Sequence, residues 1–136
     1  MSSLNIFKNN LKNIKNFNNI KNLLYRTQFN LNEIYKFKVD NMEPKLNYYN
    51  LKKDYDKYLF YKNNYLDCYF IFWNKYSCSK IHDHSDNGCY YKVIYGNSLC
   101  EYIYDKDINI TQMNTLQENE INYIDNKKEY HKMVND

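Results

Sequence analysis

Apolar side chains in the first 24 residues recur at spacings of three and four, which is the repeat of one helix face. The four charged residues of this stretch are all lysines, and they lie mostly elsewhere on the helix surface. The pattern predicts one amphipathic helix over residues 4–24. Such a helix either lies against a membrane or a partner, or packs on its own domain. We favour packing, because amphipathic helices of globular proteins usually bury their apolar face in their own domain. The apolar positions are Leu4, Phe7, Leu11, Ile14, Phe17, Ile20 and Leu24.

A second, shorter helix is predicted where Asn30 and Glu33 form the pattern of an N-terminal capping box, followed by apolar Ile34 and Phe37. From about Lys57 the pattern changes to short aromatic and β-branched runs separated by turn-like stretches, which is typical of an antiparallel sandwich or barrel. We therefore expect a helical segment over residues 1–54, packed on a β domain over residues 55–136. The predicted strands are residues 58–61, 66–73, 79–84, 89–95, 99–104, 114–116 and 121–124.

The three histidines of the chain form the most informative pattern for chemistry. His82 and His84 are separated by one residue, so on a strand their side chains point to the same face. Two imidazoles on one face form part of a metal site, which His131 would complete from another strand. Imidazole suits iron, zinc, copper and nickel, so these residues alone leave the metal open.

Length, charge and cysteine spacing restrict the class of protein. A chain of 136 residues is long enough for one domain with a core, but not for two. Its net charge is +3, and the basic residues form no run among aromatics, so we expect no nucleic-acid partner. It lacks an apolar stretch of about 18 residues and a secretory leader, so we expect no membrane span. The four cysteines lack CxxC spacing, which favours a reducing, cytoplasmic location.

The order of residues around the histidines resembles the cysteine dioxygenase family of the cupin superfamily. Residues 79–84 (SKIHDH) resemble its Ser-x-Ile-His-Asp-His signature. Cys89 stands where most cupins have a glutamate and where animal-type cysteine dioxygenases have a cysteine. His131 and Asn135 resemble the end of the second cupin motif. Further matching pieces are residues 55–63, Trp73, Gly96, residues 118–119 and residues 123–125.

The resemblance implies a mainly β fold, a cupin-type jelly-roll barrel with N-terminal α-helices. It also implies that His82, His84 and His131 bind Fe(II). The substrates would be cysteine, or a similar small thiol, and O2, with both oxygen atoms added to sulfur to give a sulfinic acid. Cys89 would be the family's cysteine beside the iron, which in the family is crosslinked to a tyrosine.

Two residues differ from those that contact the substrate in the family. Lys62 occupies the position of an arginine that holds the substrate carboxylate. Lysine can neutralise a carboxylate as a point charge, but it lacks the planar fork of arginine. Phe60 occupies the position of a tyrosine whose hydroxyl lies near the substrate, so it removes a hydrogen bond from a catalytic position.

The sequence ends five residues after His131, whereas the family continues with further strands that carry a Ser-His-Tyr relay. We therefore expect a truncated, incomplete barrel with an open sheet edge, through which a homo-oligomer could form. The family's tyrosine partner of Cys89 would be missing from its usual place. Two alternatives to a thiol dioxygenase remain: an inactive cupin acting as a binding or structural module, and a metal-binding cupin with different chemistry.

Overall fold

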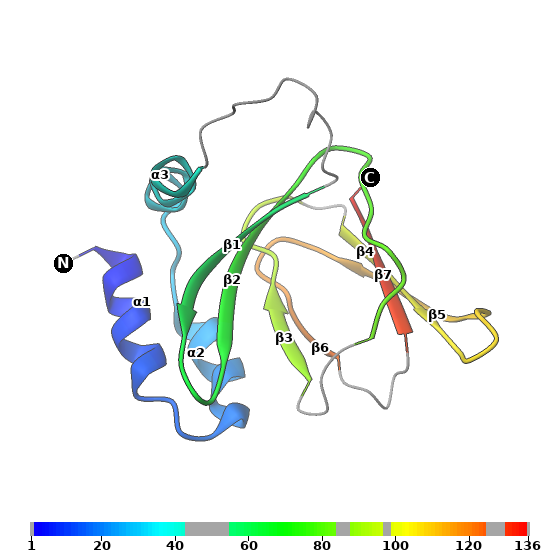
Figure 1. The fold of residues 1–136 in the computed structure, drawn as a ribbon, viewed down its shortest axis with the longest axis horizontal. Helices are drawn as coiled ribbons and strands as arrows, with labels where there is room; N and C mark the ends of the chain where they lie inside the picture. Colours follow the sequence, from blue (N-terminus) through cyan, green and yellow to red (C-terminus); the bar gives the residue numbers. More distant parts are fainter. Residues whose placement is uncertain (1, 43–54, 84–87, 97–98, 125–129, 136) are drawn as a thin grey trace. The chain divides into compact units, whose positions relative to one another are not determined.

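The computed structural model describes residues 2–42, 55–83, 88–96, 99–124 and 130–135 (Figure 1). The chain divides into two compact units, Met1–Phe72 and Trp73–Asp136. The predicted boundary between residues 54 and 55 lies at the end of a stretch outside the described residues, so it stays a prediction. Each unit is described separately below.

The N-terminal stretch forms three short helical elements, so the prediction of one helix over residues 4–24 was wrong. Helix α1 (Ser3–Lys12) is followed by the 3-10 helix η1 (Phe17–Asn19) and by α2 (Ile20–Arg26). The interruption has a local cause, because extended Asn16 accepts a hydrogen bond from the backbone N–H of Asn18 at 3.0 Å and begins η1. Asparagine side chains compete in this way with the helical hydrogen bonds of the backbone.

The apolar face of this stretch is nevertheless buried, as the spacing predicts. The break changes the helical phase, so that Leu23 rather than Leu24 is the deeply buried residue of α2. The predicted apolar positions therefore pack within the domain. Those that are buried are Leu4, Phe7, Leu11, Ile14 and Ile20.

The third helix, α3 (Leu31–Asn41), begins where the capping pattern predicts. The Asn30 side chain accepts hydrogen bonds from the backbone N–H groups of Asn32 and Glu33 at 2.9 and 3.3 Å. The Glu33 carboxylate caps a different helix. It accepts hydrogen bonds at the start of α1 from the Ser3 hydroxyl at 2.6 Å and the Leu4 N–H at 3.0 Å. Glu33 therefore ties α3 to the first turn of α1.

Strands β1 (Tyr55–Lys62) and β2 (Asp67–Trp73) pair, and their aromatic residues complete the core of the first unit. Phe60 lies in an aromatic cluster, with its ring centroid 5.1 Å from that of Phe70, 5.4 Å from Phe37 and 5.8 Å from Phe7. This cluster joins the sheet to α1 and α3. Phe60, for which the sequence resemblance implies a catalytic position, is thus packed among other aromatic rings.

The described residues of the second unit form five strands in two small sheets. Strands β5 (Ile110–Leu116), β4 (Leu99–Tyr104) and β7 (Tyr130–Asn135) form one sheet in that order. Strands β3 (Cys89–Lys92) and β6 (Ile121–Ile124) form the other. The pairings β3–β6, β4–β5 and β4–β7 are all antiparallel. The predicted mainly β fold with N-terminal helices is confirmed.

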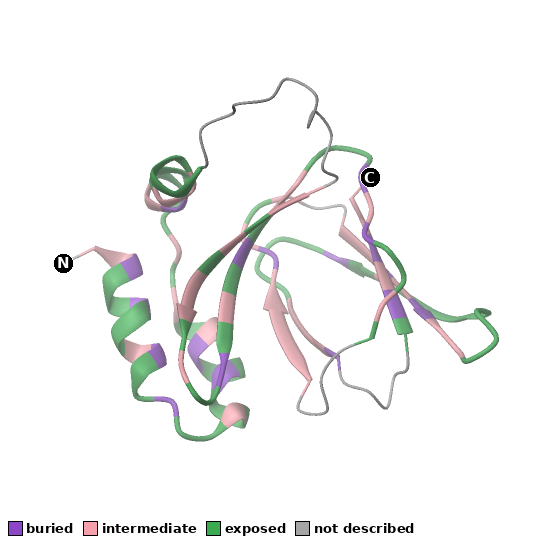
Figure 2. Cartoon of the chain, viewed as in Figure 1, coloured by how far each residue is buried: buried purple, intermediate pink, exposed green. Residues whose placement is uncertain are grey.

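Buried residues alternate with more exposed ones along β7, which indicates that one face of its sheet is covered (Figure 2). Val93, Leu116 and Met133 form the buried apolar cluster of this unit, and Trp73, Tyr91 and Leu99 pack against it. These residues come from both sheets or from the segments beside them, so the two sheets share one core. No helix among the described residues is long and apolar enough to cross a membrane.

The described part of the predicted strand over residues 79–84, which ends at residue 83, belongs to an irregular segment that runs beside β7 through two isolated bridges. Cys78 pairs with Val134, and His82 pairs with His131. From the first bridge to the second, the irregular segment runs four residues, from Cys78 to His82, whereas β7 runs three, from Val134 to His131. The irregular segment therefore contains one extra residue. This is the arrangement of a β-bulge. His84 lies outside the described residues.

Candidate metal centre

His82 and His131 face each other across the second bridge. Their backbones exchange both hydrogen bonds, at 2.9 Å from His82 N to His131 O and 2.8 Å from His131 N to His82 O. The two Nε2 atoms are 2.8 Å apart, and the ring centroids are 4.4 Å apart at an interplanar angle of 69°. Backbone pairing therefore holds the two histidines opposite each other.

The bulge explains why His82 faces His131. If the register of the Cys78–Val134 bridge continued without a bulge, residue 81 would lie opposite His131. Ile81 would then occupy the position that His82 takes. A β-bulge commonly redirects a side chain in this way next to functional sites.

The other nitrogen of each imidazole contacts an oxygen that accepts hydrogen bonds. His82 Nδ1 lies 2.7 Å from the carbonyl oxygen of Lys80, and His131 Nδ1 lies 3.0 Å from Oε2 of Glu101. A carbonyl or an ionised carboxylate can only accept, so both Nδ1 atoms carry the hydrogen. Each Nε2 then presents a lone pair to the other ring.

Two facing lone pairs at 2.8 Å repel each other unless one nitrogen carries a proton or both nitrogens bind one metal ion that lies to the side of the line joining them. Metal–imidazole bonds are about 2.0–2.1 Å long, so two neighbouring ligands of one ion lie about 3 Å apart. The separation and the donor chemistry of His82 and His131 therefore fit a metal ion.

Glu101 is the buried acid of this centre, with none of its surface exposed. Besides His131, it accepts hydrogen bonds from the Tyr91 hydroxyl at 2.7 Å, Asn114 Nδ2 at 3.1 Å and Asn122 Nδ2 at 3.0 Å. Burial by itself would raise the pKa of Glu101, but the hydrogen bonds from His131, Tyr91 and Asn114 outweigh it and hold the pKa below its usual value. Glu101 is therefore a carboxylate.

Tyr91 supports this carboxylate from the other sheet. Its hydroxyl donates to Oε2 of Glu101 and accepts from Asn122 Nδ2 at 2.8 Å. Burial, and then the negative charge of Glu101, raise the pKa of Tyr91 well above its ordinary value. The phenol therefore keeps its proton and remains a donor.

Two other residues of the sequence pattern hold the backbone around the histidines. The Ser79 hydroxyl accepts a hydrogen bond from Met133 N at 2.9 Å, beside the bulge. The Asn135 side chain donates to the carbonyl oxygen of Asn74 at 3.0 Å, after the end of β2. Both contacts fix β7 against the segment that carries His82.

The structure brings some predicted site residues together and describes others elsewhere. Cys89 lies on β3, on the same face as Tyr91. Phe60 and the exposed Lys62 lie on β1 in the first unit. Among the residues that the structure describes, no group of three His, Cys, Asp or Glu side chains is arranged to hold a metal ion. His84, the third predicted imidazole, is outside that part of the chain.

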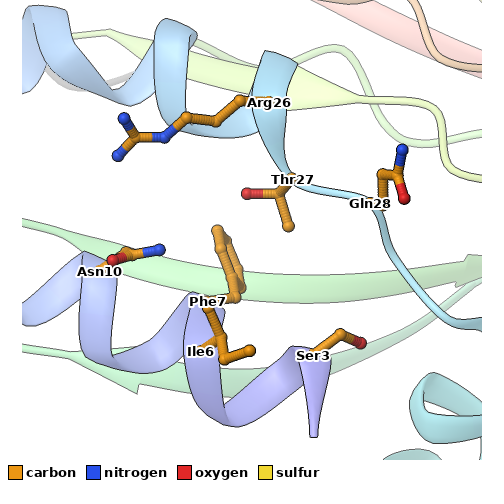
Figure 3. A pocket seen from close by; sticks show the side chains of 7 residues that line it. All are labelled: Ser3, Ile6, Phe7, Asn10, Arg26, Thr27 and Gln28. Atoms are coloured by element: carbon orange, nitrogen blue, oxygen red, sulfur yellow. The ribbon is translucent and has the colours of Figure 1, made fainter.

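A pocket of about 430 Å³ lies within the first unit, beside α1 and the end of α2 (Figure 3). None of the predicted site residues lines it. Its lining is mixed in character, with the Phe7 ring on one side and the only arginine of the chain, Arg26, on another. The remaining lining residues are Ser3, Ile6, Asn10, Thr27 and Gln28.

The sequence reasoning missed Glu101 and the residues that bind it. A signal was present, because Glu101 lies between Leu99 and Ile103 at the alternating positions of β4 that face the interior. A carboxylate at an apolar position of a strand requires buried partners. The other missed residues are Tyr91, Asn114 and Asn122.

The fold and the paired histidines define a small β protein with a candidate metal centre between two sheets. The family model described as cysteine dioxygenase type I matches residues 5–136. The chain therefore belongs to the cysteine dioxygenase type I family, whose fold is of the cupin type. A search among curated proteins found no match.

Proposed function

We propose that this protein is a thiol dioxygenase that binds Fe(II) through His82, His84 and His131. The observation that carries the proposal is the pair of Nε2 atoms 2.8 Å apart, each on a ring whose Nδ1 already has an acceptor. Membership of the family supports iron as the ion among the metals that imidazole accommodates. His84 enters the proposal from the sequence pattern.

The proposed reaction converts a small thiol, with cysteine as the first candidate, and O2 into a sulfinic acid. The balance is RSH + O2 → RSO2H, so no external reductant is needed. Iron(II), when bound, supplies the activation of dioxygen. The residues of the chain hold the imidazoles in place: Glu101 accepts from His131, and the Lys80 carbonyl accepts from His82.

The proposal also assigns roles to residues outside the histidine pair. Lys62 would neutralise the carboxylate of a cysteine substrate. Cys89 would lie beside the reacting thiol, as the corresponding cysteine does in the family. Phe60 has no hydroxyl to offer there, so we expect substrate binding to depend on Lys62 and on the metal.

Oxygen uptake after anaerobic loading with Fe(II) tests the proposal, with cysteine as the thiol and mass analysis of the product. We expect one equivalent of iron, uptake of one O2 per thiol and a sulfinic acid. His82→Gln should abolish both iron binding and uptake, whereas Tyr76→Phe, at a residue with 75% of its surface exposed, should retain them. Iron binding without uptake would contradict the enzyme and favour the alternative of a binding module.

A separate variant tests the role of Lys62. Loss of a charge-assisted contact to the substrate predicts a fall of about 10- to 150-fold in kcat/KM for Lys62→Ala. Lys57→Ala is the matched control, because Lys57 is exposed on the opposite face of the same strand. Unchanged kcat/KM in Lys62→Ala would show that the carboxylate contact is assigned to the wrong residue.

Association of two copies through a sheet edge stays a prediction. Strand β5 is one of the two outer strands of its sheet, and it carries exposed apolar residues such as Ile110 and Met113. An exposed strand of this kind can pair with another chain. Sedimentation velocity at micromolar concentration tests the idea, and a monomer would contradict it.

A further inference from the structure

Glu101 is the point at which both sheets of the second unit meet through hydrogen bonds. Its Cα lies opposite Asn114 on β5 and opposite Met133 on β7. Residue 131 lies two positions from Met133, so His131 is on the same face and reaches Glu101 diagonally. Tyr91 and Asn122 face each other on β3 and β6 and approach from the other sheet.

The four donors divide between the two oxygens of the carboxylate. Asn114 and Asn122 donate to Oε1, while Tyr91 and His131 contact Oε2. No buried side-chain nitrogen or oxygen among the described residues lacks a partner. The carboxylate therefore cannot rotate without breaking contacts on both of its oxygens.

We propose that Glu101 is a positioning residue that keeps the hydrogen of His131 on Nδ1, and thereby directs the Nε2 lone pair of His131 towards a metal ion. Asn114, Asn122 and Tyr91 hold Glu101 in place for this purpose. The proposal rests on the metal centre proposed above, but the effect of Glu101 on the tautomer of His131 can be measured in the metal-free protein. Carboxylates that bind the second nitrogen of a metal-binding histidine act in this way, and their removal lowers metal affinity by about 10- to 100-fold.

Glu101→Gln tests the proposal because glutamine has the same shape but only one accepting oxygen. Both asparagine amides approach the same side of residue 101, so the glutamine oxygen should face them. Its NH2 group then faces Tyr91 and His131, and His131 can accept only by moving its hydrogen to Nε2. That hydrogen would occupy the position of the metal-binding lone pair and point at His82 Nε2.

The first measurement is nuclear magnetic resonance of metal-free protein labelled with 15N in its histidines, which reports the tautomer of each imidazole. We expect the Nδ1–H form of His131 in the wild type and the Nε2–H form in Glu101→Gln. The second measurement is titration with Co(II), followed by its visible absorption, with an expected loss of about 10- to 100-fold in affinity. Glu118→Gln is the control, because Glu118 is an exposed glutamate of the same unit.

A wild-type tautomer and wild-type Co(II) affinity in Glu101→Gln would overturn the proposal. If Glu101→Gln does not fold, Asn114→Ala decides, since it removes one donor from Oε1 and should weaken Co(II) binding by about 2- to 10-fold. Wild-type affinity in that variant would also overturn it. If the wild type binds neither Co(II) nor Fe(II), the proposed dioxygenase fails, and the tautomer comparison in the metal-free protein still decides the role of Glu101.

Discussion

The centres of the two units are built from opposite kinds of side chain. In the first unit, Phe60 and Phe70 pack edge-on at 5.1 Å inside an aromatic cluster. In the second unit, Glu101 and His131 lie at the centre, both at most 3% exposed and hydrogen-bonded to each other. One core is held by apolar contacts between aromatic rings, and the other by hydrogen bonds with defined donors and acceptors.

This difference bears on the site that we propose in the second unit. Burying a carboxylate and an imidazole costs free energy that apolar residues would not cost, and only full hydrogen bonding offsets it. A domain of this size that needed stability alone could fill the same volume with leucine or valine. The polar centre therefore supports our placing the proposed site in the second unit, and we expect this unit to be the more sensitive to substitution.

Glu101→Leu should produce the largest effect on stability. The substitution leaves the donors of Tyr91, Asn114 and Asn122 buried without their acceptor, so we expect a loss of about 3–5 kcal/mol in the free energy of unfolding. Denaturant unfolding followed by circular dichroism measures it. The exposed Glu118→Leu should stay within about 0.5 kcal/mol of the wild type. A loss below about 1 kcal/mol in Glu101→Leu would contradict the view of a tightly held carboxylate.

Phe70→Leu makes the corresponding change in the aromatic core of the first unit. Phe70 is 6% exposed, and leucine keeps most of its apolar volume, so we expect a loss of roughly 1–2 kcal/mol. Ile71→Leu, on the exposed face of the same strand, is the matched control and should change little. If Phe70→Leu destabilised the protein as much as Glu101→Leu, the two cores would not differ in the way proposed here.

The regular parts of the fold follow from the sequence because burial follows the strand and helix repeats. Strand β4 was predicted at its observed bounds, and α3 begins where Asn30 indicates. Strand β7 was not predicted, because one of its inward positions is His131 and the alternation of apolar residues is lost there. The bulge before His82 was also missed, since it requires a register that only the pairing with β7 defines.

Only part of the candidate site could be predicted from the sequence. His82 and His131 stand out in a chain with three histidines, and the structure places them side by side. Glu101 is one of many charged residues, and its role depends on partners that lie between 10 and 30 residues away in sequence. Such a network can be recognised only after the two sheets have been placed against each other.

Glu33 is a carboxylate of the first unit that lies outside the aromatic core. It can therefore be compared directly with Glu101 of the second unit, and we expect its effect on stability to be the smallest of those considered. The hydrogen bond from the Ser3 hydroxyl, and then that from the Leu4 N–H, lower the pKa of Glu33 below its ordinary value of 4.5. A carboxyl whose pKa is lower in the folded state stabilises the fold above its unfolded pKa. This contribution is lost as the pH falls through the folded pKa.

We therefore expect Glu33→Gln to be less stable than the wild type at neutral pH, with a difference that shrinks once the pH falls below about 4.5. Thermal unfolding at a series of pH values measures this, with the exposed Glu120→Gln as the control. A difference that stays constant over the whole pH range would show that the Glu33 carboxylate does not cap α1. The expected effect is small because water screens this partly exposed contact, whereas the Glu101 network is shielded from water by both sheets.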